Sequence, residues 1–264
     1  MSELGIGILG ADGRMGREVV KAVAVTEGAR LVAAFTQDGA ATIGRDAGEV
    51  ANLQPVGVKI GAFTADALAG CDVLVDFSSP KATRTAVLAM QTGPCQALVT
   101  GTTGQSEEEL QELHSLAEGL RFLRAGNFSL GVNLMAALVE RAARSLGEGY
   151  DIELEETHHR HKVDSPSGTA ILLGEAAARG RSIALDFVED RSGARPPGSI
   201  GLAVKRTGGV VGDHAVSFTS ELESLEISHR ALDRSVFAHG AVAAARWLAG
   251  QPPGRYGMRD VLGL

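Results

Sequence analysis

Short apolar runs alternate with amphipathic segments through the first half of the chain. We expect strands at residues 4–9, 30–36, 72–77 and 96–100, and one more strand followed by a loop within 121–128. The run DVLVDF is apolar on both faces, as in a buried strand of a parallel sheet. Three helices are expected between these strands. The first covers about 17–25, the second follows the segment SSP after the third strand and ends near residue 90, and the third covers 107–120. This alternation predicts an α/β domain built on a doubly wound, Rossmann-like parallel sheet.

The pattern changes in the second half. One long helix is expected at 129–147, then a strand at 150–158 and a helix at 166–180. Four strand-like runs follow, joined by segments rich in Gly and Pro, at 183–189, 199–206, 214–220 and 222–230. These runs predict a second, α+β domain on a mixed sheet, with the last helix, 238–250, packing back on the first domain. We predict a dinucleotide-binding domain of residues 1–128 plus 239–264, and a substrate-binding and oligomerisation domain of residues 129–238.

Composition narrows the class of protein. The chain is 44% hydrophobic and 22% charged, with a formal net charge of -7 and a sequence pI of about 5.5. An acidic balance argues against a partner that is nucleic acid or membrane surface, because such binders carry a broad basic face. No apolar run approaches the roughly 18 residues of a membrane span. The first residues lack the basic start of a signal peptide, and Cys71 and Cys95 are isolated in the sequence, so we expect a cytoplasmic protein without disulfides.

A glycine turn, GADGRMG, follows the first predicted strand and opens the first predicted helix. Glycines let the backbone approach a pyrophosphate, and a helix N-terminus offers amide groups and the positive end of the helix dipole. The spacing is G-x-x-G-x-x-G rather than the usual G-x-G-x-x-G, so the motif alone also suits a purely structural turn. Its place at the head of a strand–helix alternation favours binding of NADH or NADPH.

The end of the second predicted strand bears on which cofactor is used. An acidic residue there would bind the ribose 2′-hydroxyl of NAD, but this strand ends with Thr36 and Gln37. Neither side chain repels a 2′-phosphate or supplies a charge to bind one, although Arg14 or Lys81 can contribute that charge. Asp38 is interpreted as a turn residue. The sequence therefore favours acceptance of both NADH and NADPH.

Basic and titratable side chains crowd into the segment HHRHK at residues 158–162. His158 and His161 have a spacing that binds metal on a helix, but the preceding residues alternate as a strand and no third ligand stands at a recognisable spacing. We therefore predict no metal site. A solvated surface run, neutralised by nearby acidic residues, is the ordinary alternative.

The helix that follows favours a functional interpretation. Ser167 stands at the cap position, and Gly168 and Thr169 open the helix, so their amide groups form an anion site next to the cationic cluster. Two adjacent anion sites suit a small dicarboxylate or a phosphate compound. A hydride acceptor also needs a proton, and a histidine is able to supply one near neutral pH. The residues alone predict a nicotinamide-dependent enzyme that acts on a small anion.

The sequence resembles the 4-hydroxy-tetrahydrodipicolinate reductase (dihydrodipicolinate reductase) family of lysine and diaminopimelate biosynthesis. The resemblance covers nearly the whole chain, in GADGRMGR, VDFSSP, VTGTTG, AGNFSLGVNL, ETHHRHKVDSPSGTA, GSIGLAVKRTGGVVGDH and GMRDVL. Its specific part is the string E-x-H-H-x-x-K-x-D-x-P-S-G-T-A. The resemblance implies that NADH or NADPH delivers a hydride to a small cyclic dicarboxylate, giving tetrahydrodipicolinate. It also implies a homotetramer.

The resemblance implies roles for individual residues. His158 matches the family's proton donor, and Lys162 matches its other catalytic position. The carboxylate-binding positions are His159, Lys162, Ser167, Gly168 and Thr169. The cofactor-binding positions are Gly10, Ala11, Asp12, Gly13, Arg14, Met15, Gly101, Thr102, Thr103, Ala125, Gly126, Asn127 and Phe128, together with Thr36 and Gln37 at the end of the second strand.

Some features depart from the family pattern or leave alternatives. Many members have Glu-Arg in place of Thr36-Gln37 and Arg in place of Ser79, which bears on cofactor preference. On a continuous strand His158 and His159 would point to opposite faces, so we expect the strand to end or bulge there. Two other functions remain open: a two-domain, aspartate-type amino-acid dehydrogenase, and a non-catalytic dinucleotide-binding module.

Overall fold

The computed structural model describes residues 3–190 and 192–264 of the chain. Contacts between residues divide the chain into two compact units. The first unit contains the residues up to Ser129 together with Ser235–Gly263, and the second contains Leu130–Arg234. No helix in the described ranges is both long enough and apolar enough to cross a membrane.

The first unit is built on a seven-stranded sheet with the order β12-β6-β5-β4-β1-β2-β3, in which all neighbours are parallel. Its strands are β1 (Leu4–Leu9), β2 (Ala29–Thr36), β3 (Ile60–Ala62), β4 (Val73–Asp76), β5 (Ala97–Thr100), β6 (Arg121–Arg124) and β12 (Gly254–Tyr256). Its helices are α1 (Arg14–Val25), α2 (Ala47–Val50), α3 (Pro80–Met90), α4 (Glu107–Leu116), α7 (Ser235–Leu248) and α8 (Met258–Leu262). The strand order reverses between β1 and β4, which is where doubly wound sheets bind their ligands.

Two hydrophobic cores, one on each face, explain the apolar strands of this sheet. One core joins Ile6, Ile8 and Val75 to α1 and to α7, which returns to this unit as predicted. The other joins Leu74 and Leu98 to α3 and α4. A strand that lies between two such cores has no polar face, so its sequence reads as a continuous apolar run.

The second unit has a five-stranded mixed sheet with the order β11-β10-β7-β9-β8. Its strands are β7 (Asp151–His158), β8 (Phe187–Val188), β9 (Ile200–Arg206), β10 (Gly212–Thr219) and β11 (Ser224–Ala231). Its helices are α5 (Leu130–Leu146) and α6 (Gly168–Arg181). The predicted fold class is confirmed, but the strand expected over 183–189 is only the two residues of β8. The surrounding apolar side chains, Leu185 and Phe187, instead pack against the core of this unit.

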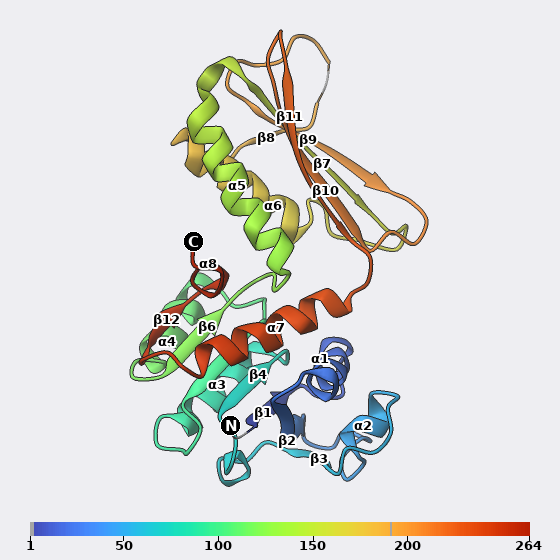
Figure 1. Ribbon diagram of the computed structural model, residues 1–264, viewed down its shortest axis with the longest axis vertical. Helices are drawn as coiled ribbons and strands as arrows, with labels where there is room; N and C mark the ends of the chain where they lie inside the picture. The colour runs from blue at the N-terminus through green and yellow to red at the C-terminus, as the bar shows by residue number, and fades with distance from the viewer. Residues whose placement is uncertain (1–2, 191) are drawn as a thin grey trace. The chain divides into compact units, whose positions relative to one another are not determined.

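Helices α5 and α6 cover one face of this sheet (Figure 1). Along β7 the side chains that face the helices are first apolar, Ile152 and Leu154, and then polar, Glu156 and His158. On β10 the apolar pair Val216 and Phe218 is likewise accompanied by a buried His214. The helix-covered face therefore changes from hydrophobic core to polar cluster at the carboxyl end of β7.

Candidate active site

The glycine turn of the first unit is held tightly against the following strands. Gly10 has a φ of +81°, and a Cβ on it would lie 2.7 Å from the backbone oxygen of Phe77. A Cβ on Gly16 would lie 2.0 Å from the backbone oxygen of Gly10. Gly13 caps α1 and brings no side chain to the first-turn amide groups. The residues present therefore fit a pyrophosphate, which needs close backbone approach and the N-terminus of a helix.

Asp12 stabilises the turn from within. Its carboxylate accepts hydrogen bonds from the hydroxyls of Thr36 and Thr42, both at 2.6 Å. Partial burial raises the pKa of Asp12, but these two hydrogen bonds, together with a backbone hydrogen bond and the charge of Arg17, leave the pKa below its usual value. Asp12 therefore ties the turn to the end of β2 and to the loop that follows it.

A cavity of about 550 Å³ lies beside the turn. It is lined by Gly10, Asp12, Gly13, Thr36 and Gln37, among others, and by Lys81 from the first turn of α3. Of the predicted cofactor residues in the turn itself, Gly10 to Met15, three lie outside this lining. Ala11 is buried in the core, Met15 packs against the core, and the side chain of Arg14 is exposed.

The other predicted cofactor segments follow β5 and β6 at the same edge of the sheet. Asp76, at the end of β4, is fully buried and accepts hydrogen bonds from the hydroxyls of Ser78, Thr83, Thr100 and Thr102. The amide of Gly101 also donates to the backbone oxygen of Asp76, at 2.9 Å. Asp76 thus fixes the start of the segment Gly101–Thr103, in which Thr103 is exposed.

The segment Ala125–Phe128 lies next to it. The amide of Ala125 donates to the carbonyl of Thr100 at 3.1 Å, and Gly126 is exposed. The side chain of Asn127 accepts from the amide of Ser129, and the ring of Phe128 packs edge-to-face on Phe77 at 5.5 Å. The predicted cofactor segments therefore lie at the carboxyl ends of β1, β2, β5 and β6, on one edge of the parallel sheet.

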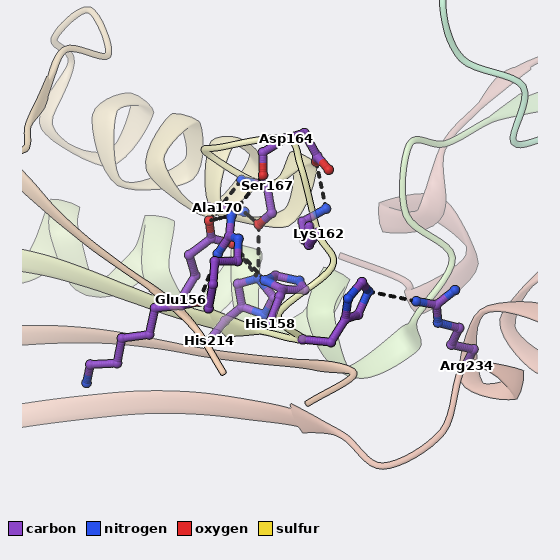
Figure 2. A network of polar contacts seen from close by, with 11 residues as sticks. Glu156, His158, Lys162, Asp164, Ser167, Ala170, His214 and Arg234 are labelled. Atoms are coloured by element: carbon purple, nitrogen blue, oxygen red, sulfur yellow. Dashed lines mark hydrogen bonds and ion pairs between the residues drawn. The ribbon is translucent and has the colours of Figure 1, made fainter. Parts of the chain in front are cut away.

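The titratable cluster of the second unit begins where β7 ends. β7 stops at His158, which confirms the expected end of the strand between His158 and His159. The carbonyl of His158 accepts from the amide of Thr207, and that of His159 from the amide of Lys162, so the chain turns directly after the strand. Figure 2 shows His158 close to Glu156 and His214, with Lys162 and Ser167 nearby.

Glu156 is the fully buried charge at the centre of this cluster. Its Oε1 accepts from the amide of Ser167 and from Nη2 of Arg206, both at 3.1 Å. Its Oε2 lies 3.1 Å from Nδ1 of His158 and 3.7 Å from Nε2 of His214. Burial raises the pKa of Glu156, but the hydrogen bonds from Ser167 and Arg206 outweigh it and lower the pKa overall. Glu156 is therefore ionised at neutral pH.

The two histidines respond to burial and to their charged neighbours. Burial lowers the pKa of His158, the Glu156 carboxylate opposes that effect, and Lys162 and Arg206 add to it. Burial is also the main reason that the pKa of His214 falls to about 4. His214 is therefore neutral at neutral pH, and its Nε2 lies 3.2 Å from the hydroxyl of Ser167. Ser167 in turn caps α6 by accepting from the amide of Ala170 at 3.1 Å.

The loop between β7 and α6 is held by cations. Lys162 forms an ion pair with Asp164 at 2.6 Å, and the backbone oxygen of Asp164 accepts from Arg206 at 2.8 Å. Lys162 lowers the pKa of Asp164. The turn thereby brings Lys162 and Ser167, the cap of α6, to the same corner as His158.

His159 lies apart from this network. Its Nε2 is 2.9 Å from Nη2 of Arg234 (Figure 2). Because a guanidinium group only donates hydrogen bonds, His159 accepts at Nε2. The structure thus places His159 beside a cation that the sequence analysis did not consider.

Four residues of this corner were missed by the sequence analysis, namely Glu156, Arg206, His214 and Arg234. Glu156 belongs to the specific string but was not given a role. His214 carries a detectable signal, because it alternates with Val216 and Phe218 and so occupies an inward position of a strand. Arg206 and Arg234 carry no such signal, since only the pairing of strands and the path of the loops bring them here.

The same donors have a spacing that also suits a metal ion. One ligand atom each of Glu156, His158 and His214 lies within 4.8 Å of the others. However, Arg206 already balances the charge of Glu156 at 3.1 Å, and Lys162 adds a second positive charge near His158. Two cations next to the site oppose binding of a dication. We therefore interpret the cluster as a proton-carrying and anion-binding network.

Comparison with known proteins gives matches over nearly the full length. The family model described as "Dihydrodipicolinate reductase, N-terminus" matches residues 4–128, and "Dihydrodipicolinate reductase, C-terminus" matches residues 131–262. A 4-hydroxy-tetrahydrodipicolinate reductase of Methylocella silvestris is 49% identical, covering 100% of this chain and 98% of the relative. One of Halorhodospira halophila is 47% identical, covering 99% of each.

Solved structures give a likeness of fold. A dipicolinate-bound dihydrodipicolinate reductase from Paenisporosarcina sp. TG-14 has a TM-score of 0.76 at 23% identity, covering 98% of each chain. An amine dehydrogenase from Mycobacterium smegmatis has a TM-score of 0.59 at 13% identity, covering 97% of this chain and 95% of the other. The two-unit architecture is thus shared with oxidoreductases that differ in the substrates their names state.

Proposed function

The chain belongs to the dihydrodipicolinate reductase family, and we propose that it reduces 4-hydroxy-tetrahydrodipicolinate to tetrahydrodipicolinate with NADH or NADPH. It is an oxidoreductase of lysine and diaminopimelate biosynthesis. The nicotinamide, when bound, supplies the hydride. The observation that carries the proposed site is the gathering of His158, Lys162 and the N-terminus of α6 at one corner of the second unit.

Binding of the cofactor is assigned to the carboxyl edge of the first sheet. The turn from Gly10 to Gly13 and the N-terminus of α1 would hold the pyrophosphate, and the segments that follow β5 and β6 would hold the nicotinamide end. For NADPH, Lys81 is the positively charged side chain that lines the cavity at the end of β2, so it would meet the 2′-phosphate. Thr36 contributes less, because its hydroxyl already donates to Asp12.

Binding of the substrate is assigned to the corner of the second unit. A ring with two carboxylates needs two anion sites. Lys162 and His159 would hold one carboxylate, and Ser167 with the opening amide groups of Gly168 and Thr169 would hold the other. The dipicolinate named for the Paenisporosarcina structure is such a ring, which supports this assignment. Fixing both carboxylates orients the ring carbon that accepts the hydride.

Proton transfer is assigned to His158. Reduction leaves electron density on a ring carbon, and a protonated imidazole beside it would quench that density. In the chain alone burial lowers the pKa of His158, which disfavours the protonated form. A bound dianion raises that pKa again by favouring the imidazolium. The proton would therefore be taken up together with the substrate.

Assembly is proposed from the helix-free face of the second sheet. Small side chains there, Ala203, Ala215 and Ser217, lie among ion pairs of which Glu155–Lys205 is one, at 3.0 Å. No described helix covers this face. A half-polar sheet surface that no described helix covers suits packing against the same surface of another copy, which supports a homotetramer. Light scattering on the purified protein tests this assembly, and we expect the enzyme in the cytoplasm.

The function is tested by steady-state kinetics on the purified protein with both cofactors. We expect NADH and NADPH to be oxidised with the cyclic dicarboxylate and not with aspartate or homoserine. Turnover of aspartate would instead support an amino-acid dehydrogenase. Binding of NADPH, seen by its fluorescence, without consumption of any dicarboxylate would support a non-catalytic module.

A further inference from the structure

The two ring nitrogens of His158 have different surroundings. Nδ1 is buried and lies 3.1 Å from Oε2 of Glu156, at an ion-pair distance although not aligned as a hydrogen bond. Nε2 lies on the opposite side, towards Gly212 at the start of β10. The two nitrogens are therefore not equivalent as proton donors.

Glu156 is itself unable to turn away from His158. Its other oxygen is held by the amide of Ser167 and by Arg206. Ser167 is the cap of α6, and Arg206 ends β9 opposite His158 in the parallel pairing of β7 and β9. The carboxylate is thus fixed from two separate elements, and its second oxygen is kept 3.1 Å from Nδ1 of His158.

Gly212 leaves room on the other side of the ring. A Cβ on Gly212 would lie 3.1 Å from Nε2 and 3.5 Å from Cδ2 of His158, and 3.5 Å from Cε1 of His214. The contact with Nε2 is the tight one. Gly212 does not have a positive φ, so its backbone conformation is open to any residue. The absence of a side chain at this position is explained by space next to Nε2 and not by the backbone.

We propose that Glu156 and Gly212 are positioning residues for His158: Glu156 fixes the ring by its Nδ1 side, and Gly212 keeps Nε2 uncovered as the nitrogen that transfers the proton. This inference rests on the proposed function, since it assumes that His158 is the acid. It adds the orientation of the acid and the two residues that set it. Neither residue contacts substrate in this scheme.

The charges around His158 decide the sign of the test. Glu156 on the same strand and Asp164 in the loop are negative, whereas Lys162 in the loop and Arg206 on β9 are positive. On β10 His214 is neutral, and His229 of β11 lies beyond it. Loss of the Glu156 charge removes the strongest influence that favours the imidazolium and leaves Arg206 unbalanced. The pKa of His158 must then fall further.

Glu156→Gln tests the first half of the proposal. The titration of His158 is followed by NMR of its ring, and His158→Gln identifies its signal among the seven histidines. We expect the titration, and the alkaline limb of the pH profile of kcat/KM, to move to lower pH, with about a tenfold loss of kcat at neutral pH. Glu156→Asp, which keeps the charge, should restore part of this shift. Glu175→Gln, the same change at an exposed position of α6, should move neither.

Gly212→Ala tests the second half. We expect kcat to fall about tenfold with KM for the dicarboxylate nearly unchanged and with the titration of His158 near its wild-type position. Gly209→Ala, in the same loop, is the matched control, because a Cβ there meets no atom within 4 Å. Thermal unfolding of each variant shows whether it is folded.

The outcomes separate the inference from the function on which it rests. If His158→Gln keeps near-normal turnover, the assignment of the acid is wrong. If His158→Gln abolishes turnover but Glu156→Gln leaves both the NMR titration and the pH limb in place, the role of Glu156 is overturned and the proposed function stands. A wild-type kcat in folded Gly212→Ala overturns the role of Gly212. If one variant fails to fold, the other still decides its own half.

Discussion

Each unit of the chain buries one acidic side chain completely among the described residues, Asp76 in the first and Glu156 in the second. Hydroxyl groups surround Asp76, from Ser78 and three threonines. Glu156 is instead balanced by the guanidinium of Arg206 and faces two imidazoles. Asp76 therefore organises strand ends through neutral hydrogen bonds, whereas the charge of Glu156 acts on groups that exchange protons.

The difference extends to the two sites as a whole. The cofactor edge of the first unit depends on backbone shape, with glycines where a Cβ would meet backbone atoms. The corner of the second unit depends on charge, because His158, Lys162, Asp164 and Arg206 all influence one another. We expect the first site to be sensitive to volume and hydrogen bonding, and the second to charge and pH.

Replacement of His158 should have the largest effect on catalysis. His158→Gln removes the proposed proton donor but keeps a polar side chain of similar reach, so we expect kcat to fall by roughly 100- to 10,000-fold with little change in KM. Steady-state kinetics with saturating NADPH measures both constants. Near-normal turnover would contradict the comparison of the two units, because the site of the second unit would then lack the acid that we assign to it.

Replacement of Lys162 should follow. Lys162→Ala removes the cation that we propose binds a carboxylate and orients the ring, so kcat and KM should each change, by roughly tenfold or more in kcat/KM. Lys59→Ala is the control, because Lys59 is an exposed lysine of the first unit. A KM equal to that of wild type would exclude Lys162 as a carboxylate ligand.

Asp76→Asn should affect stability more than chemistry. The new amide donates where Asp76 only accepts, so at least one buried hydroxyl loses its partner, and we expect a loss of about 2–3 kcal/mol in the free energy of unfolding. KM for the cofactor should rise, since the segment after β5 shifts, but the pH profile should keep its position. Urea unfolding, with Asp66→Asn as an exposed control, measures the loss. A moved pH limb would mean that the two buried carboxylates act alike.

Binding of a dicarboxylate ligand should show the smallest and most selective difference. The pKa of His158 lies below its usual value in the chain alone and rises when a dianion binds, so binding takes up a proton. Affinity for pyridine-2,6-dicarboxylate should then increase as the pH falls between these two pKa values, by at most about tenfold per pH unit. Calorimetry in buffers of different ionisation enthalpy detects the proton. Affinity for NADH should change much less over the same pH range. If it changed equally, the sites of the two units would not differ in their sensitivity to pH.

The parallel sheet and its glycine turn were predictable because their signals are local. Apolar runs such as DVLVDF and the turn after β1 each lie within one short segment. The short elements α2, β3, β12 and α8 were not predicted, since three to five residues are too few to show a period. The strand expected at 183–189 was largely wrong, because apolar residues that pack on a core imitate a strand.

The corner of the second unit was predictable only in part. The string from Glu156 to Ala170 is continuous in the sequence, so this part of the site can be predicted from the sequence. Arg206 and His214 come from β9 and β10, and only the register of the sheet places them opposite His158 and Glu156. Gly212 gives no signal at all, because its importance lies in a distance to a side chain of another strand.

The link from Arg206 to the backbone of Asp164 has a consequence for affinity. A loop that is loose before its ligand arrives loses conformational entropy on binding, and the observed affinity is weakened by that amount. Here the guanidinium of Arg206 holds the loop against the neighbouring strand in the folded chain, so the loop has less conformational entropy to lose when a ligand binds. A small, rigid ring with few contacts can therefore still be bound firmly.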